Sequence, residues 1–61
     1  MMNYYSGPTN VFDPEPQGSL FAESLDGSIQ IWEAESYEND SVTKITREMA
    51  EEIITRPGWA G

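Results

Sequence analysis

The segment from Asp40 to Arg56, DSVTKITREMAEEIITR, carries the strongest periodic signal in this 61-residue chain. Its apolar residues recur at steps of three and four, the spacing of one stripe on an α-helix: Val42, Ile45, Met49 and Ile53, with Ala50 and Ile54 widening the stripe. The polar residues 39–41 suit a helix N-cap, and Pro57 before Gly58 would end the helix, because proline disfavours α geometry in the residue that precedes it. The pattern predicts a C-terminal helix over residues 41–55.

Two strand-like runs, SLFAESL and SIQIWEAE, flank the pair Asp26-Gly27. Asp-Gly between such runs favours a β-hairpin, because both residues tolerate the positive φ angles of a tight turn. The sequence therefore predicts a hairpin over residues 19–35. Its apolar residues should meet the helix on one face and leave Trp32 on the other.

The register of this hairpin depends on the length of its turn. A two-residue turn would set Ala22 opposite Ile31, whereas a three-residue loop with a glycine bulge would set Leu20 opposite Trp32. Both registers place Ile29 and Ile31 on one face. The two alternatives stay open at this point.

Residues 1–18 contain three of the four prolines and two glycines, which argues against a helix or a central strand. We expect an extended arm over 1–18, with Val11 and Phe12 as a short edge strand and Trp32 covered by the arm or by a partner. A single small domain over 19–61 would follow. The predicted fold class is α+β, in which an antiparallel hairpin, or a three-stranded sheet, packs on one C-terminal helix.

The composition lacks the residue types on which most catalytic and metal-binding sites depend. The chain has no cysteine and no histidine, which removes the thiolate and imidazole groups that most metal sites and general bases use. It has no phosphate-binding glycine loop and no nucleophile motif. We therefore expect no enzyme activity, no cofactor and no metal, and we expect a soluble, cytoplasmic protein without a membrane segment.

The charge is the most informative total, because 11 acidic residues face 3 basic ones and give a formal charge of −8. Such a field repels nucleic acid and attracts basic protein surfaces. The carboxylates that we expect to contact a partner lie near the helix start and along the helix: Glu33, Glu35, Glu38, Asp40, Glu48, Glu51 and Glu52. Carboxylates spaced over a surface can imitate nucleic-acid phosphates and occupy a basic groove.

The aromatic residues support a second hypothesis. Trp32 and Trp59 are each either part of the core or an exposed anchor for a partner, and Tyr4 and Tyr5 in the arm could serve in the same way. The alternative function is then an interaction protein, an antitoxin-like or regulatory subunit that binds through apolar contacts. A lone hairpin is marginal in water, so homodimerisation is a further variant of this hypothesis.

In size, composition and plan, the chain resembles the short, cysteine-free acidic proteins that bacteriophages and mobile elements encode, among them anti-CRISPR proteins. The resemblance covers the whole chain but involves no shared motif, so no residue is carried over. It implies an inhibitor of a host nucleic-acid enzyme that docks on the basic surface of an effector complex, a polymerase, a nuclease or a repair enzyme.

Overall fold

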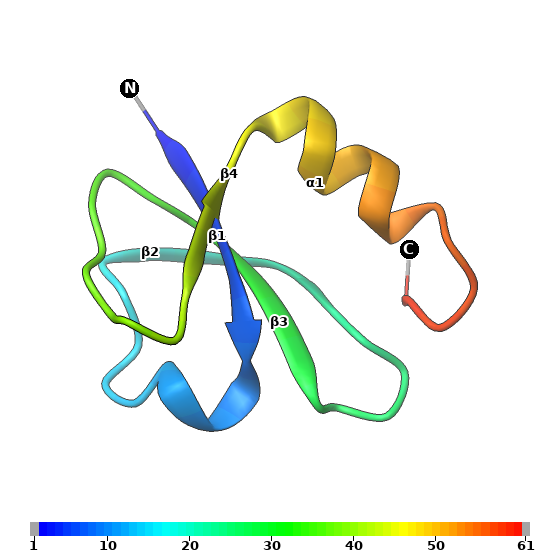
Figure 1. Cartoon of the computed structure of the whole chain (residues 1–61), viewed down its shortest axis with the longest axis horizontal. Helices are drawn as coiled ribbons and strands as arrows, with labels where there is room; N and C mark the ends of the chain where they lie inside the picture. The colour runs from blue at the N-terminus through cyan, green and yellow to red at the C-terminus, as the bar shows by residue number, and fades with distance from the viewer. Residues whose placement is uncertain (1, 61) are drawn as a thin grey trace.

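The computed structural model describes residues 2–60, which form a four-stranded antiparallel sheet and one C-terminal helix (Figure 1). The elements follow in the order β1 (Asn3–Pro8), the 3-10 helix η1 (Thr9–Val11), β2 (Gly18–Glu23), β3 (Ile29–Ala34), β4 (Thr43–Ile45) and α1 (Arg47–Ile54). The strands lie in the spatial order β2-β3-β1-β4. The predicted α+β class is confirmed.

β1 lies inside the sheet, between β3 and β4, so the expectation that residues 1–18 contain no central strand is wrong. The prolines misled the prediction because all of them fall at or after Pro8, the last residue of β1. The residues before Pro8 include Tyr4 and Tyr5, which favour strands. Val11 and Phe12 do not form an edge strand, since Val11 ends η1 and Phe12 caps it.

The two faces of the sheet carry separate small cores, because successive side chains of a strand point in opposite directions. Tyr4 packs with Ile31 and Ala50 under α1 and the C-terminal segment. Tyr5 packs on the other face with Phe12 and the other buried residues of that cluster, Trp32 and Ala34. Trp32 is therefore covered by the segment after β1, as the sequence indicated.

The helix is shorter than predicted, beginning at Arg47 instead of residue 41. The residues expected to form its first turn instead form β4, which pairs with β1. Val42, Thr43 and Ile45 are β-branched and favour a strand, and pairing with β1 adds backbone hydrogen bonds that an isolated helical turn would lack. The Thr46 hydroxyl then caps α1 by accepting a hydrogen bond from the backbone nitrogen of Met49 at 3.1 Å.

The buried stripe of α1 matches the predicted one except at Met49. Ala50 is fully buried, and Ile53 and Ile54 pack beside it against Tyr4 and Ile31. Met49 lies outside this stripe and is 49% exposed. The predicted end of the helix is confirmed, because α1 stops at Ile54 and the chain turns at Gly58 with φ of +98°.

The β2–β3 hairpin is confirmed, and each predicted register holds over one part of it. Near the turn Ala22 lies opposite Ile31, whereas Leu20 lies opposite Trp32, because a bulge between Leu20 and Ala22 shifts the pairing by one residue. Gly27 adopts φ of +72° in the turn. The sequence pattern could not locate this bulge, since Phe21 looks like an ordinary strand residue.

The hairpin turn is held by the carboxylate of Asp26. Its Oδ1 atom accepts hydrogen bonds from the Ser28 hydroxyl at 2.6 Å, the Ser28 backbone nitrogen at 3.0 Å and the Ser24 hydroxyl at 2.7 Å. These bonds favour the ionised carboxylate and lower the pKa of Asp26 to about 2, with the Ser28 hydroxyl as the largest cause.

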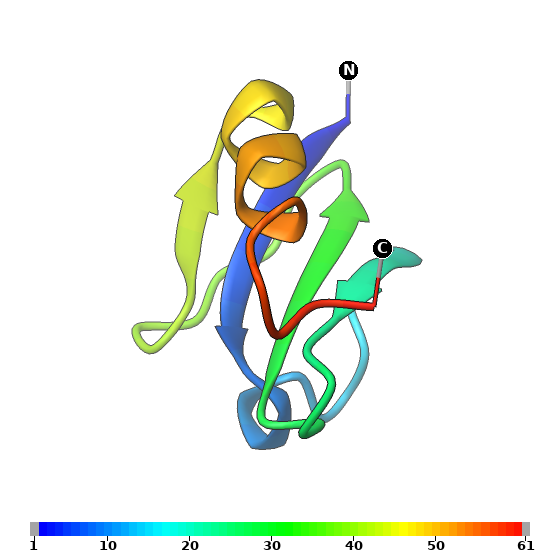
Figure 2. The same cartoon turned by 90° about the vertical axis from the view of Figure 1, so that its right-hand side faces the viewer.

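The C-terminal segment returns to the hairpin. Trp59 forms an antiparallel bridge with Ser24, and the Leu25 backbone nitrogen donates to the Gly58 carbonyl at 2.8 Å. Figure 2 looks onto this face of the sheet, where α1 and the C-terminal segment lie over the strands. The side chain of Trp59 is half-buried and packs against the α1-side core.

Gly18 is the position at which the hairpin depends most on glycine. A Cβ atom at residue 18 would lie 1.8 Å from the backbone oxygen of Glu33, so β2 and β3 could not keep their spacing. We expect Gly18→Ala to lower the free energy of unfolding by at least about 3 kcal/mol, the upper end of overpacking costs. Urea unfolding measures the change. The matched variant Ser19→Ala should change it by less than about 0.5 kcal/mol, since Ser19 is exposed; equal effects would contradict the close approach.

Candidate interaction surface

The net charge is confined to the first part of the chain. Residues 1–43 hold eight of the eleven acidic residues and no lysine or arginine, so they account for the whole formal charge of −8. Residues 44–61 are neutral, because three basic side chains balance three acidic ones. The sheet strands β1 to β3 and their connections are therefore acidic, and the part that contains β4 and α1 is not.

Two connections carry five of the eight acidic side chains of residues 1–43, and they pack on the side of the sheet away from α1. Segment 12–17 and segment 35–42 lie side by side there, with Phe12 and Tyr37 ring centroids 5.5 Å apart (Figure 1). All five carboxylates of these segments are exposed. We call this surface the acidic face: Asp13, Glu15, Glu35, Glu38 and Asp40.

Hydrogen bonds attach segment 35–42 to the body of the protein. The Tyr37 hydroxyl donates to the Val11 carbonyl at 2.9 Å, and the side-chain amide of Asn39 donates to the same oxygen at 3.2 Å. At the start of the segment, the Asn3 side-chain amide donates to the Glu35 carbonyl at 2.8 Å. These contacts hold Glu35, and the neighbours of Glu38, in one backbone conformation.

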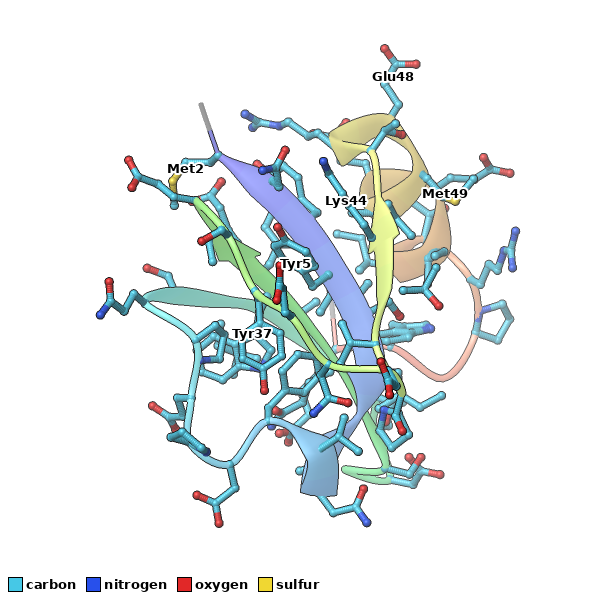
Figure 3. All side chains as sticks on the ribbon, turned by 60° about the vertical axis from the view of Figure 1, so that its left-hand side comes forward. Met2, Tyr5, Tyr37, Lys44, Glu48 and Met49 are labelled. Atoms are coloured by element: carbon cyan, nitrogen blue, oxygen red, sulfur yellow. The ribbon has the colours of Figure 1, made fainter. Side chains whose placement is uncertain are left out.

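Aromatic packing supports the same segment from below. Tyr37 lies against Tyr5, with ring centroids 6.1 Å apart, and Figure 3 shows the two rings between β1 and the connection. Phe12 continues the layer towards Trp32 at 6.0 Å. The acidic face therefore rests on a packed layer, which reduces the conformational entropy that a partner would have to remove on binding.

Within residues 2–60, both ion pairs lie along α1 and neither involves the acidic face. Arg47 Nε lies 3.1 Å from Glu51 Oε1, and Arg56 Nη2 lies 3.7 Å from Glu52 Oε1. Glu48 points away from the body at the start of α1 (Figure 3). Glu51 and Glu52 thus have cations beside them, whereas no ion pair within residues 2–60 involves a carboxylate of the acidic face.

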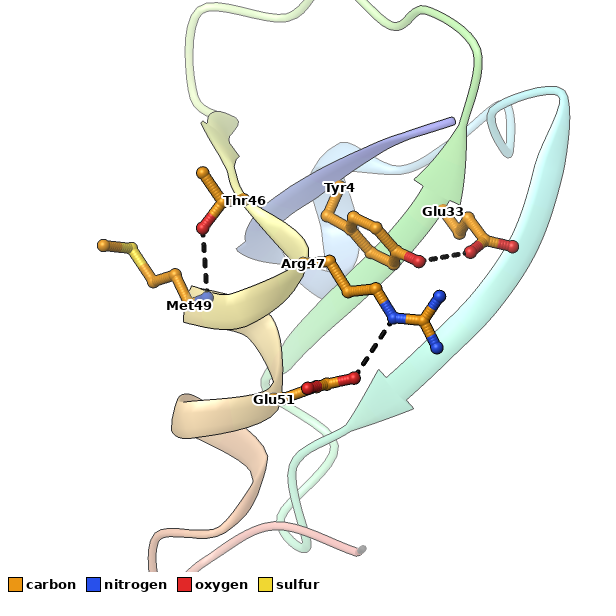
Figure 4. A network of polar contacts seen from close by, with 6 residues as sticks. All are labelled: Tyr4, Glu33, Thr46, Arg47, Met49 and Glu51. Carbon is orange, nitrogen blue, oxygen red and sulfur yellow. Dashed lines mark hydrogen bonds and ion pairs between the residues drawn. The ribbon is translucent and has the colours of Figure 1, made fainter. Parts of the chain in front are cut away.

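Glu33 belongs to a polar network on the α1 side. Its Oε2 atom accepts a hydrogen bond from the Tyr4 hydroxyl, and the Arg47 guanidinium lies between this pair and Glu51 (Figure 4). The hydrogen bond to Glu33 raises the pKa of Tyr4, because it favours the protonated phenol, and burial adds to the shift. Glu33 is half-buried and its carboxylate contacts the protein itself.

The seven carboxylates predicted to contact a partner therefore fall into two groups. Glu35, Glu38 and Asp40 lie on the acidic face, whereas the remaining four lie on the α1 side: Glu33, Glu48, Glu51 and Glu52. The prediction treated residues 33–40 as one run, but the chain crosses the end of the sheet after Ala34. Trp32 is only 6% exposed and Trp59 is half-buried, so both contribute to the cores.

Asp13 and Glu15 are members of the acidic face that the sequence analysis did not name. They lie in a proline-rich segment that gave no periodic signal. The contact that brings them beside Glu38 joins Phe12 to Tyr37, which are 25 residues apart in the chain. A pairing over such a distance leaves no local pattern to detect.

A small hollow of about 270 Å³ lies between the start of β1 and the β4–α1 junction. Tyr4, Met2 and Ile45 give it an apolar lining, and Lys44 and Arg47 contribute two of the three basic residues of the chain. No residue of the acidic face lines it, but Lys44 lies opposite Tyr5 and so points to the Tyr5 side of the sheet. The hollow is open and its basic residues are few, so it offers no enclosed site for chemistry.

The described residues, 2–60, contain no group of three histidine, cysteine, aspartate or glutamate side chains that could hold a metal ion. In the same residues, no helix has the length and apolar character required to cross a membrane. No protein-family model, curated protein or solved structure matches the chain. The functional argument therefore rests on the surface itself.

The Tyr4–Glu33 bond gives a testable titration. We expect Glu33→Gln to bring the pKa of Tyr4 back towards 10, because a neutral amide stabilises the protonated phenol less than a carboxylate does. The bond's contribution to stability is complete below pH 10 and is lost as the pH rises through the raised pKa. Ultraviolet titration of the phenols, or NMR of Tyr4, measures the shift.

Glu35→Gln is the matched control for this titration. This substitution removes one negative charge, as Glu33→Gln does. The hydrogen bond of Glu35 to Asn3 uses the Glu35 backbone oxygen, so the substitution leaves that bond in place. If Glu33→Gln and Glu35→Gln shift the Tyr4 titration equally, the effect is one of net charge and the specific bond is contradicted.

Proposed function

We propose that the protein is a binding protein that occupies a basic surface of a nucleic-acid-binding enzyme or complex and thereby inhibits it. The acidic face would supply the contact, acting as a mimic of nucleic-acid phosphates. Binding requires no cofactor and no reaction, and the proposed site of action is the cytoplasm.

The observation that carries this proposal is the separation of charge. All of the net charge belongs to residues 1–43, and five exposed carboxylates of that part lie in the two segments that pack on the Tyr5 side of the sheet. A concentrated negative surface speeds encounter with a basic partner and fixes its orientation. The α1 side, where Glu51 and Glu52 pair with arginines, would then face away from the partner.

The support of the acidic face favours a contact of defined geometry. Segment 35–42 is held by side-chain bonds to Val11 and packs on Tyr5 and Phe12. A surface that is already ordered loses less entropy on association than a flexible acidic tail would. This makes the surface suited to a groove that normally binds a stiff nucleic-acid backbone.

The apolar-anchor alternative has less support. Tyr4, Tyr5 and Trp32 are 4%, 5% and 6% exposed, so their area is already used within the protein. A partner would have to open one of the two cores to reach them. The five exposed carboxylates need no such opening.

The experiment compares two double charge reversals that each change the net charge from −8 to −4. We expect Glu35→Lys with Glu38→Lys to weaken capture of basic nucleic-acid-binding proteins from a lysate at least tenfold. Glu48→Lys with Glu52→Lys is the matched control on α1, and it should weaken capture only about two- to threefold through the lower net charge. Circular dichroism checks that both variants keep the fold.

Salt provides the second measurement. Capture at about 50 mM salt should be lost at about 500 mM, since the screening length falls from more than 10 Å to a few ångströms, and a short DNA duplex should compete for the same partner. Equal losses for the two variants, or capture that resists 500 mM salt, would contradict the proposal.

A further inference from the structure

The outer edge of β2 is a second feature that the proposed function does not use. β2 is the end strand of the sheet and pairs with β3 on one side only. An end strand presents backbone N–H and C=O groups that can pair with another chain. The other end strand, β4, has only three residues.

The protein already uses one end of this edge for strand pairing. Gly58 to Ala60 run antiparallel beside the end of β2, with the Ser24–Trp59 bridge at the centre. The Leu25 nitrogen donates to the Gly58 carbonyl at 2.8 Å, and the Ala60 nitrogen donates to the Glu23 carbonyl at 3.3 Å. The edge therefore accepts an added antiparallel strand in this fold.

The rest of the edge is open. Among residues 2–60, no segment pairs with the outer side of β2 from Gly18 to Ala22. Gly18, Ser19 and Leu20 are exposed, and the Leu20 side chain is 46% exposed. This stretch contains the bulge between Leu20 and Ala22, but it has no lysine, proline or inward-facing charge of the kind that also protects natural edges.

The charges around the open stretch determine which partner fits. Ser19 lies opposite Glu33, and Gly18 lies opposite Ala34, next to Glu35. Neither β2 nor β3 contains a basic residue. An added strand would therefore meet negative charge along these two strands, with Arg47 of α1 beside Glu33 on the helix side (Figure 4).

We propose that the open stretch of β2, from Gly18 to Ala22, binds an extended lysine- or arginine-bearing segment of the partner by antiparallel strand addition. The proposal rests on the proposed function, because the same basic partner would supply the segment, and it adds the way in which that partner is held. Backbone pairing would give affinity, and the carboxylates would select basic side chains at alternate positions. A second copy of the chain fits less well, because it would bring another charge of −8 to the same place.

The test uses two synthetic peptides of equal charge and the same lysine–valine alternation, one with free backbone N–H groups and one with every backbone nitrogen methylated. Only the unmethylated lysine–valine peptide can donate backbone hydrogen bonds to the open edge. We expect it to bind the isotope-labelled protein at least tenfold more tightly. Its binding should also slow amide hydrogen exchange in Ser19–Ala22, as followed by NMR.

Two matched variants locate the contact. Leu20→Lys puts a cation on the open edge, whereas Leu25→Lys makes the same change at a 72% exposed position in the hairpin turn. We expect Leu20→Lys to weaken binding of the unmethylated peptide at least fivefold more than Leu25→Lys does. Equal effects of the two variants would overturn strand addition at this edge.

The remaining outcomes separate the two proposals. If both peptides bind equally, binding to basic partners survives and strand addition is overturned. If neither peptide binds, the proposed binding of basic partners and the proposed strand addition are both overturned. If sedimentation shows a dimer of the protein alone that Leu20→Lys dissociates, the edge belongs to a second copy and the proposal is overturned.

Discussion

The structure depends on two adjacent tyrosines in β1 that point to opposite faces of the sheet. Tyr4 and Tyr5 are 4% and 5% exposed, and each is a buried member of one of the two small cores. A chain of 61 residues cannot build one large core, so it covers both faces of a single thin sheet instead. Because β1 lies between β3 and β4, its side chains on both faces of the sheet can be buried.

Different segments of the chain cover the two cores, and these segments differ in net charge. α1 and the C-terminal segment cover Tyr4, and they belong to the neutral residues 44–61. Segments 12–17 and 35–42 cover Tyr5, and they carry the five exposed carboxylates of the acidic face. The proposed partner surface is thus the outer side of a cover that the fold needs for its own stability.

The sequence predicted the features that arise from local chemistry. Asp26-Gly27 located the hairpin turn, and Pro57-Gly58 located the end of the helix. The sequence failed where pairing between distant segments decides the outcome: β4 forms because β1 is beside it, and β1 is central because both of its neighbours come later in the chain. For the same reason, charge counting predicted one acidic surface but grouped Glu33 and the helix carboxylates with residues 35–40.

The most direct test of the charge separation is paramagnetic relaxation of backbone amide protons by small nitroxide cosolutes, one cationic and one neutral. The ratio of the two effects reports the local potential at each amide. The ratio should be several-fold larger in residues 12–17 and 35–40 than along Arg47–Ile54. A uniform ratio over the surface, or the largest ratio along α1, would contradict the account.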